Sequence, residues 1–217
     1  DAFECGIIEL YGLTEGIITT LEVEHAEGRW ASVGRPLIGT DLCIVDDNDR
    51  VLAAGQPGEI CSRGRIAMPG YWQRPDANKE VEFIDPQGQL WLRSGDIGYI
   101  DSDGFLYIVD RKKDMILSGG QNIYPQDIEA VAVDNEQVFD VAVIGFPSER
   151  WGETPVALVV PKPNVGFDAE LFKAWLNSRL GRQQKVADVI VTDELPRNPN
   201  GKILKRELRT TFADRHY

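Results

Sequence analysis

The chain has 217 residues, of which 42% are hydrophobic and 27% charged, a balance typical of folded globular proteins rather than disordered ones. Its formal net charge is −12, from 23 Lys and Arg against 35 Asp and Glu. So acidic a surface repels polyphosphate, so we expect no nucleic-acid binding and no basic membrane-binding face. No apolar run approaches the roughly 20 residues that cross a bilayer, so we expect no transmembrane segment and a cytoplasmic protein.

Metal-ligating and disulfide-forming residues are scarce. Cys5, Cys43 and Cys61 are odd in number, widely spaced and without a CxxC pair, so the sequence supports neither a disulfide framework nor a zinc site. His25 and His216 lie in polar surroundings with no second ligand at useful spacing, so we expect both to be ordinary surface residues.

The first half of the chain reads as β-rich. Short strands bounded by turn residues are expected at 42–46, 59–62, 91–92, 99–100 and 106–109. The last two are joined by Asp-Ser-Asp-Gly, a composition typical of a hairpin turn. The same letters begin a calcium loop, but the remaining ligands of an EF-hand are missing, so a plain turn is favoured.

The second half has helical and strand patterns together. A helix is expected to begin at Pro125, and valine-rich strands follow at 138–146 and 154–160. Asp168 is a suitable N-cap for a second amphipathic helix. A strand at 189–191 and a terminal helix with Leu204, Leu208 and Phe212 on one face complete the pattern. The sequence therefore predicts a mixed α/β fold, a β-rich part followed by a compact α+β part, joined near residues 110–114.

Two segments in the β-rich half could bind a nucleotide. In Tyr-Gly-Leu-Thr-Glu at 11–15, the ring can stack on a base, and Thr14 and Glu15 can hold magnesium near phosphates. In Ser-Gly-Asp-Ile-Gly at 94–98, Asp96 lies on an expected turn and can present its carboxylate to the vicinal hydroxyls of a ribose. Taken singly, each segment is more commonly an ordinary turn.

Two further segments concentrate charge. Asp-Arg-Lys-Lys-Asp at 110–114 lies at the expected joint, and the Gly-Gly loop within 118–125 allows a ligand to approach the backbone closely. A charge run by itself is usually a solvated surface. The loop at 195–202 is rich in Pro and Gly and ends on Lys202, a compact charge suited to a phosphate or a carboxylate.

In order and spacing these segments resemble the adenylate-forming superfamily, specifically its acyl-CoA synthetase branch. The resemblance runs from Tyr11 to about Arg209 and includes Gly-Glu-Ile at 58–60 and Met-Pro-Gly-Tyr-Trp at 68–72. It implies that a carboxylic acid, fatty or otherwise apolar, attacks ATP to give an acyl-adenylate. Coenzyme A then displaces AMP. The implied small-molecule partners are thus the acid, ATP with Mg²⁺, and CoA.

The resemblance also implies a fold and a set of nucleotide contacts. Residues 1–112 would be a distorted, barrel-like remnant of the large adenylating domain, and residues 113–217 a small mobile C-terminal domain. The residues implied to bind ATP or AMP are Tyr11 and Gly12 at the adenine and Asp96 and Arg111 at the ribose. The residues implied to act in the first step are Thr14 at a phosphate, Glu15 at Mg²⁺, and Lys202 at the reacting carboxylate and phosphate.

The remaining implied roles concern the second step. Lys113 would be the hinge about which the small domain rotates between the two steps. Gly119 and Gly120 would line the tunnel for the pantetheine arm of CoA, with Trp151 beside it. Lys185 would lie near the CoA nucleotide. Here the family's aromatic-Lys-x-Pro segment is replaced by Gln-Gln-Lys-Val-Ala, which keeps the lysine but lacks the aromatic ring and the proline.

A second departure concerns length. The family's phosphate-gripping loop precedes the Tyr-Gly-Leu-Thr-Glu motif, and this chain begins only ten residues before Tyr11. We therefore expect the C-terminal part of a synthetase, inactive alone, for which self-association through exposed large-domain surface stays open. Two alternatives also stay open: an adenylating enzyme that loads a carrier protein, and a non-catalytic binding module derived from the fold. Glu15, Asp96 and Lys202 favour descent from an active enzyme.

Overall fold

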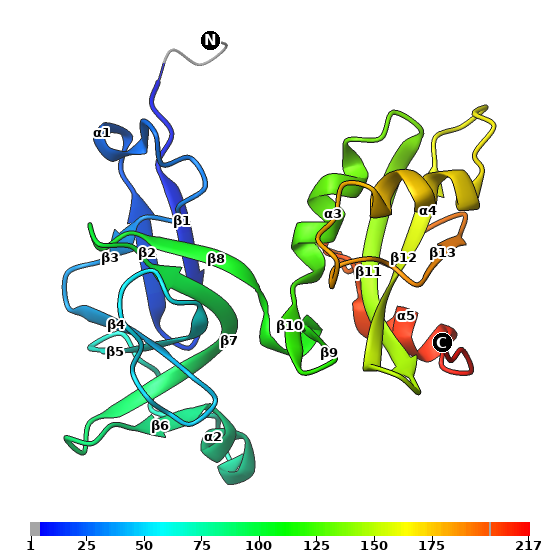
Figure 1. The fold of residues 1–217 in the computed structure, drawn as a ribbon. Coiled ribbons are helices and arrows are strands. Elements are labelled where there is room, and N and C mark those ends of the chain that lie inside the picture. Colours follow the sequence, from blue (N-terminus) through cyan, green and yellow to red (C-terminus); the bar gives the residue numbers. More distant parts are fainter. Residues whose placement is uncertain (1–4, 200) are drawn as a thin grey trace. The chain divides into compact units, whose positions relative to one another are not determined.

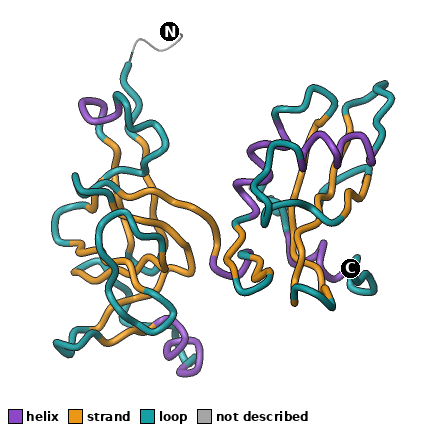
Figure 2. The backbone as a smooth tube through the Cα atoms, viewed as in Figure 1, coloured by secondary structure: helices purple, strands orange, loops and turns teal. Residues whose placement is uncertain are grey.

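The computed structural model describes residues 5–199 and 201–217, and the chain divides into two compact units, unit 1 up to Lys112 and unit 2 from Lys113 (Figure 1). Strands dominate unit 1, whereas unit 2 combines strands with helices (Figure 2). The predicted mixed α/β class, β-rich first and α+β second, is confirmed. No helix within the described residues is long and apolar enough to cross a membrane.

Unit 1 contains antiparallel sheets that pair strands close in sequence. One sheet has the order β1-β2-β3; in the other the order is β4-β5-β7-β6, with β8 also paired to β7. The bounds in unit 1 are β1 Glu9–Leu13, β2 Ile17–Leu21, α1 Val23–Ala26, β3 Arg35–Pro36, β4 Thr40–Val45, β5 Gly58–Gly64, α2 Pro75–Val81, β6 Glu82–Ile84, β7 Leu90–Ile100 and β8 Leu106–Arg111. The long strand β7 curls through this unit and contributes to both of the side-chain clusters described below (Figure 1).

A bulge interrupts the pairing of β7 with β5. Cys61 of β5 lies opposite Arg93 of β7, but Glu59 lies opposite Ile97, so two steps along β5 match four along β7. Gly95, inside the bulge, has φ of +71°, a left-handed conformation that glycine adopts without steric cost. The prediction of a turn between two separate strands is therefore wrong. The strand continues, and the glycine serves a bulge.

Unit 2 is built around two long, paired strands, β11 and β12. The sheet has the order β10-β9-β12-β11, and β13 pairs parallel to β12. The bounds in unit 2 are β9 Ile116–Ser118, β10 Gln121–Ile123, α3 Pro125–Val133, β11 Val138–Ser148, β12 Gly152–Pro161, α4 Ala169–Asn177, β13 Asp188–Val191 and α5 Lys205–Thr211. A 3-10 turn over Lys112–Asp114 spans the boundary between the units.

Both faces of β11 and β12 are covered, which explains their valine-rich sequences. Val141 and Val143 pack into the cluster formed with α3 and α4, whereas Ala142 and Ile144 pack into the cluster formed with α5. The predicted cap of α4 is present, because the Asp168 side chain accepts hydrogen bonds from the backbone N–H groups at its start.

We expect Ile144→Ala to lower the free energy of unfolding by about 2–5 kcal/mol, because a buried side chain is replaced by a cavity. Leu171→Ala on α4 is the control: Leu171 is 71% exposed, and its loss should cost less than about 0.5 kcal/mol. Urea unfolding followed by circular dichroism measures both. Equal losses in the two variants would contradict the two-faced core of unit 2.

Candidate functional site

The carboxylate of Asp96 is buried in unit 1 and paired with two side chains from other strands. Asp96 is only 3% exposed. The Tyr11 hydroxyl donates a hydrogen bond to Asp96 Oδ2 at 2.6 Å, and Arg111 Nε lies 2.7 Å from Asp96 Oδ1. Asp96 and Arg111 are directly opposite on β7 and β8, whereas Tyr11 comes from β1 of the other sheet. The fold thus brings together three side chains that the sequence separates by as much as 100 positions.

These contacts define the charge state of the cluster. Burial and the hydrogen bond to Asp96 raise the pKa of Tyr11 well above its ordinary value, so Tyr11 remains a protonated donor at neutral pH. Each carboxylate oxygen of Asp96 keeps a second lone pair, which a ligand hydroxyl could use. The Arg111 side chain is 35% exposed, so its guanidinium reaches the surface beside that carboxylate. The arrangement suits vicinal hydroxyls next to an aromatic ring.

Glu15 lies in the turn after β1 and is held by two hydroxyls. Tyr71 Oη donates to Glu15 Oε1 at 2.7 Å, and Thr14 Oγ1 donates to Glu15 Oε2 at 3.0 Å. The hydrogen bond from Tyr71 is the largest influence on Glu15 and lowers the pKa of its carboxyl, which stays ionised. Sequence reasoning did not assign Tyr71 a role, although it lies in the Met-Pro-Gly-Tyr-Trp stretch that supported the resemblance.

Glu15 can contribute to a Mg²⁺ site but cannot form one alone. Among the described residues, no group of three or more His, Cys, Asp or Glu side chains could hold a metal ion. Proteins commonly bind Mg²⁺ through one or two carboxylates together with substrate phosphates and waters. An ionised carboxylate beside the Thr14 hydroxyl fits that mode.

Lys202 stands at the end of a closed loop in unit 2. The Asn198 side chain accepts the Lys202 N–H at 2.8 Å, and the Asn198 N–H donates to the Lys202 carbonyl at 2.9 Å. Arg197 and Ile203 form an antiparallel bridge across the base, and Arg197 is paired with Asp140 of β11. The loop is thereby tied to the sheet of unit 2, and Lys202, next to the bridge at its base, is exposed.

A cavity of about 850 Å³ lies in unit 2 and brings together three of the residues assigned to CoA, namely Gly119, Trp151 and Lys185. Gly120 is not among its lining residues. Arg150 and Arg182 also line it, so the cavity combines an indole ring with cationic side chains. His216, which we expected to be an ordinary surface residue, also lines it.

Gly119 fits this cavity for a specific steric reason. Its N–H donates to the Trp151 carbonyl at 2.8 Å, and its φ is +56°. A Cβ at this position would lie 2.9 Å from a ring carbon of Trp151, closer than real Cβ contacts allow. A side chain at Gly119 would therefore displace the indole that forms the cavity wall.

Family comparisons match both units. A model described as AMP-binding enzyme matches residues 1–72, and one described as AMP-binding enzyme C-terminal domain matches residues 127–202. The chain belongs to the AMP-binding enzyme family. The resemblance found in the sequence is confirmed, and the two matched regions lie in different units.

Among the curated proteins most similar to this chain are CoA ligases. The chain is 39% identical over 205 residues to 2-succinylbenzoate–CoA ligase of Geobacillus kaustophilus, covering 94% of this chain and 41% of the relative. It is 42% identical over 207 residues to long-chain-fatty-acid–CoA ligase of Escherichia coli O157:H7, covering 94% and 35%. The chain therefore spans about two fifths of the length of such relatives.

Solved structures of the family show the same fold. ATP-bound MatB from Rhodopseudomonas palustris matches with a TM-score of 0.85 at 32% identity, over 96% of this chain and 41% of MatB. The o-succinylbenzoate–CoA synthetase of Bacillus subtilis, in complex with its acyl-adenylate intermediate, matches with a TM-score of 0.81 at 34% identity, over 94% and 41%.

We expect Tyr71→Phe to raise the pKa of Glu15 toward its ordinary value, because the substitution removes the strongest hydrogen bond to the ionised carboxylate. The side-chain carboxyl ¹³C shift, followed by NMR against pH, measures the midpoint. Thr14→Val is the control and should produce a smaller rise, since the Thr14 hydrogen bond is a lesser cause. An unchanged midpoint in Tyr71→Phe would contradict the described contact.

Proposed function

We propose that this chain is the C-terminal part of an ATP-dependent acid–CoA ligase that acts in the cytoplasm on a fatty or related apolar acid. Unit 1 then corresponds to the end of the large adenylating domain and unit 2 to the small mobile domain. The observation that carries the proposal is the contact of Asp96 with Tyr11 and Arg111, here called the Asp96 cluster, because a carboxylate held between a tyrosine and an arginine suits a ribose next to a base. The family membership and the CoA-ligase relatives support it.

In the first step, Tyr11 and Gly12 would lie at the adenine, and Asp96 and Arg111 would bind the ribose hydroxyls. Thr14 would contact a phosphate. Attack of a carboxylate on a phosphate brings two anions together, so a preorganised cation lowers the barrier by several kcal/mol. We assign that role to Lys202. Mg²⁺, when bound at Glu15, would add charge neutralisation at the phosphates.

In the second step, the cavity of unit 2 would receive CoA. Gly119 permits close approach of a narrow pantetheine arm, and Gly120 continues the same glycine loop. The indole of Trp151 supplies an apolar wall, and Lys185 supplies a positive charge for the CoA phosphates. Arg150 and Arg182 also line the cavity. Their positive charges suit the phosphates of CoA, which favours CoA over a carrier protein as the thiol that accepts the acyl group.

Lys113 is the proposed hinge between the two steps. It is exposed and sits within the 3-10 turn at the boundary of the units. Rotation of unit 2 about Lys113 would move Lys202 away from the acyl carbon of the adenylate and bring the CoA cavity to it. Few contacts would have to be rebuilt, because only one residue changes its backbone conformation.

We expect Lys202→Ala, in the longer synthetase that contains this chain, to slow acyl-adenylate formation by on the order of 10²–10³-fold. Conversion of supplied acyl-adenylate to the thioester should be nearly unaffected. Pyrophosphate release and thioester formation, measured separately with a fatty acid as substrate, give the two rates. Lys162→Ala, at another exposed lysine of unit 2, is the control and should leave both rates unchanged. Equal slowing of both steps in a folded Lys202→Ala protein would contradict the assigned role.

A further inference from the structure

A second buried carboxylate lies close to the end of unit 1, and nothing in the proposed chemistry uses it. Glu59 on β5 is 6% exposed. Arg93 Nη1 lies 2.8 Å and Lys112 Nζ lies 2.9 Å from the same oxygen, Glu59 Oε2. Removing a carboxylate from water is costly unless charged partners compensate it, and losing one partner of such a pair is strongly destabilising. Arg93 and Lys112 therefore compensate the buried charge of Glu59 together.

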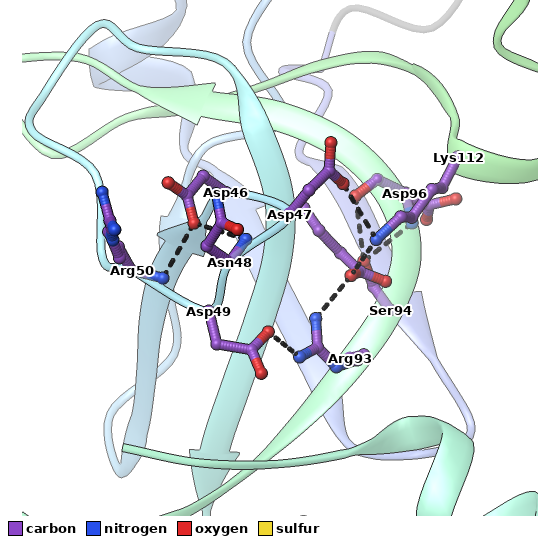
Figure 3. Close-up of polar contacts among 10 residues, drawn as sticks. Asp46, Asp47, Asn48, Asp49, Arg50, Arg93, Ser94, Asp96 and Lys112 are labelled. Carbon is purple, nitrogen blue, oxygen red and sulfur yellow. Dashed lines mark hydrogen bonds and ion pairs between the residues drawn. The ribbon is translucent and has the colours of Figure 1, made fainter. Parts of the chain in front are cut away.

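An acidic turn between β4 and β5 adds to this attraction. Asp47 lies 3.6 Å from Lys112 Nζ, and Asp49 is paired with Arg93 (Figure 3). Asp46 Oδ1 accepts the N–H groups at positions 48 and 50 at 2.8 and 2.9 Å, which shapes the turn so that its acidic side chains meet the two cations. We call Asp47, Asp49, Glu59, Arg93 and Lys112 the Glu59 ion cluster.

The position of Lys112 in the chain gives the cluster its significance. Lys112 is the last residue of unit 1, and the preceding Arg111 is already paired with Asp96. On the other side of the boundary, Asp114 is buried in unit 2 and paired with Arg209 of α5 at 3.0 Å. Ion pairs within unit 1 thus fix the chain up to Lys112. An ion pair within unit 2 fixes it from Asp114 onward. Lys113 is exposed between these two anchored residues.

We propose that Lys112 and Asp114 are positioning residues, which confine rotation between the units to the backbone around Lys113. Without the Lys112 anchor, the pivot would extend back into β8 and Arg111 would move with every rotation. With it, the Asp96–Arg111 pair stays intact while unit 2 moves. The consequence for catalysis rests on the proposed two-step function, but the anchoring itself does not.

The test is amide hydrogen exchange of the 217-residue chain, without ligand, in Lys112→Gln. We expect exchange at Asp110 and Arg111 to accelerate by at least about tenfold, because the end of β8 then opens locally. Lys112→Arg, which keeps the charge, should restore protection. Lys79→Gln, at an exposed lysine of α2, is the matched control and should exchange like the unmodified chain.

Two outcomes would overturn the proposal. One is unchanged protection at Asp110 and Arg111 in Lys112→Gln. The other is an equal rise throughout β4, β5 and β7, because the ion cluster would then merely stabilise unit 1 as a whole. If Lys112→Gln does not fold, Asp47→Asn removes the weaker contact and should give a smaller rise confined to the same amides. Since the measurement uses neither ATP nor CoA, its failure is distinguishable from failure of the proposed ligase function.

Discussion

The burial of two carboxylates near one end of unit 1 is the constraint on which the rest of the account depends. Asp96 and Glu59 are both almost fully enclosed, and each would be costly without a cation beside it. Their cations come from adjacent positions, since Arg111 pairs with Asp96 and Lys112 pairs with Glu59. The last residues of β8 are therefore fixed by electrostatics as well as by backbone pairing.

This constraint links the proposed binding site to the proposed motion. The segment that completes the proposed ribose-binding cluster is also the segment that ends at the proposed hinge. A ligase with two conformations needs the nucleotide to stay bound while its other reactants are exchanged. Consecutive ion pairs at Arg111 and Lys112 would keep the proposed nucleotide site rigid. The proposed moving domain could then begin only one residue later in the chain. Asp114 and Arg209 would do the same from the side of unit 2.

Much of the fold followed from local patterns in the sequence. The valine-rich strands of unit 2 are long and buried on both faces, and Asp168 caps α4, so composition and capping predicted these elements well. The bulge in β7 was predicted as a turn, because a glycine between polar residues is typical of turns and of bulges alike. Strands β1 and β2 were not predicted, since the segment Tyr-Gly-Leu-Thr-Glu has the composition of a binding motif or a turn.

The candidate site was only partly predictable for a related reason. The resemblance implied roles for Tyr11, Asp96 and Arg111, but their mutual contact depends on pairing between strands far apart in sequence. Glu59 and Tyr71 lie in stretches that supported the resemblance, but neither stretch indicates which side chains they contact. A buried glutamate looks like any surface glutamate until its cations are located in space, and the charge run containing Lys112 looks like solvated surface.

The central claim is that the Asp96 cluster binds the ribose of an adenine nucleotide, and an NMR titration of the 217-residue chain with AMP tests it most directly. The account predicts that backbone amide shifts change at Gly12, Asp96 and Arg111. It also predicts that 2′-deoxy-AMP binds at least about tenfold more weakly, because a hydroxyl partner of the carboxylate is lost. Equal binding of the two nucleotides, or shifts confined to residues around the unit 2 cavity, would contradict it.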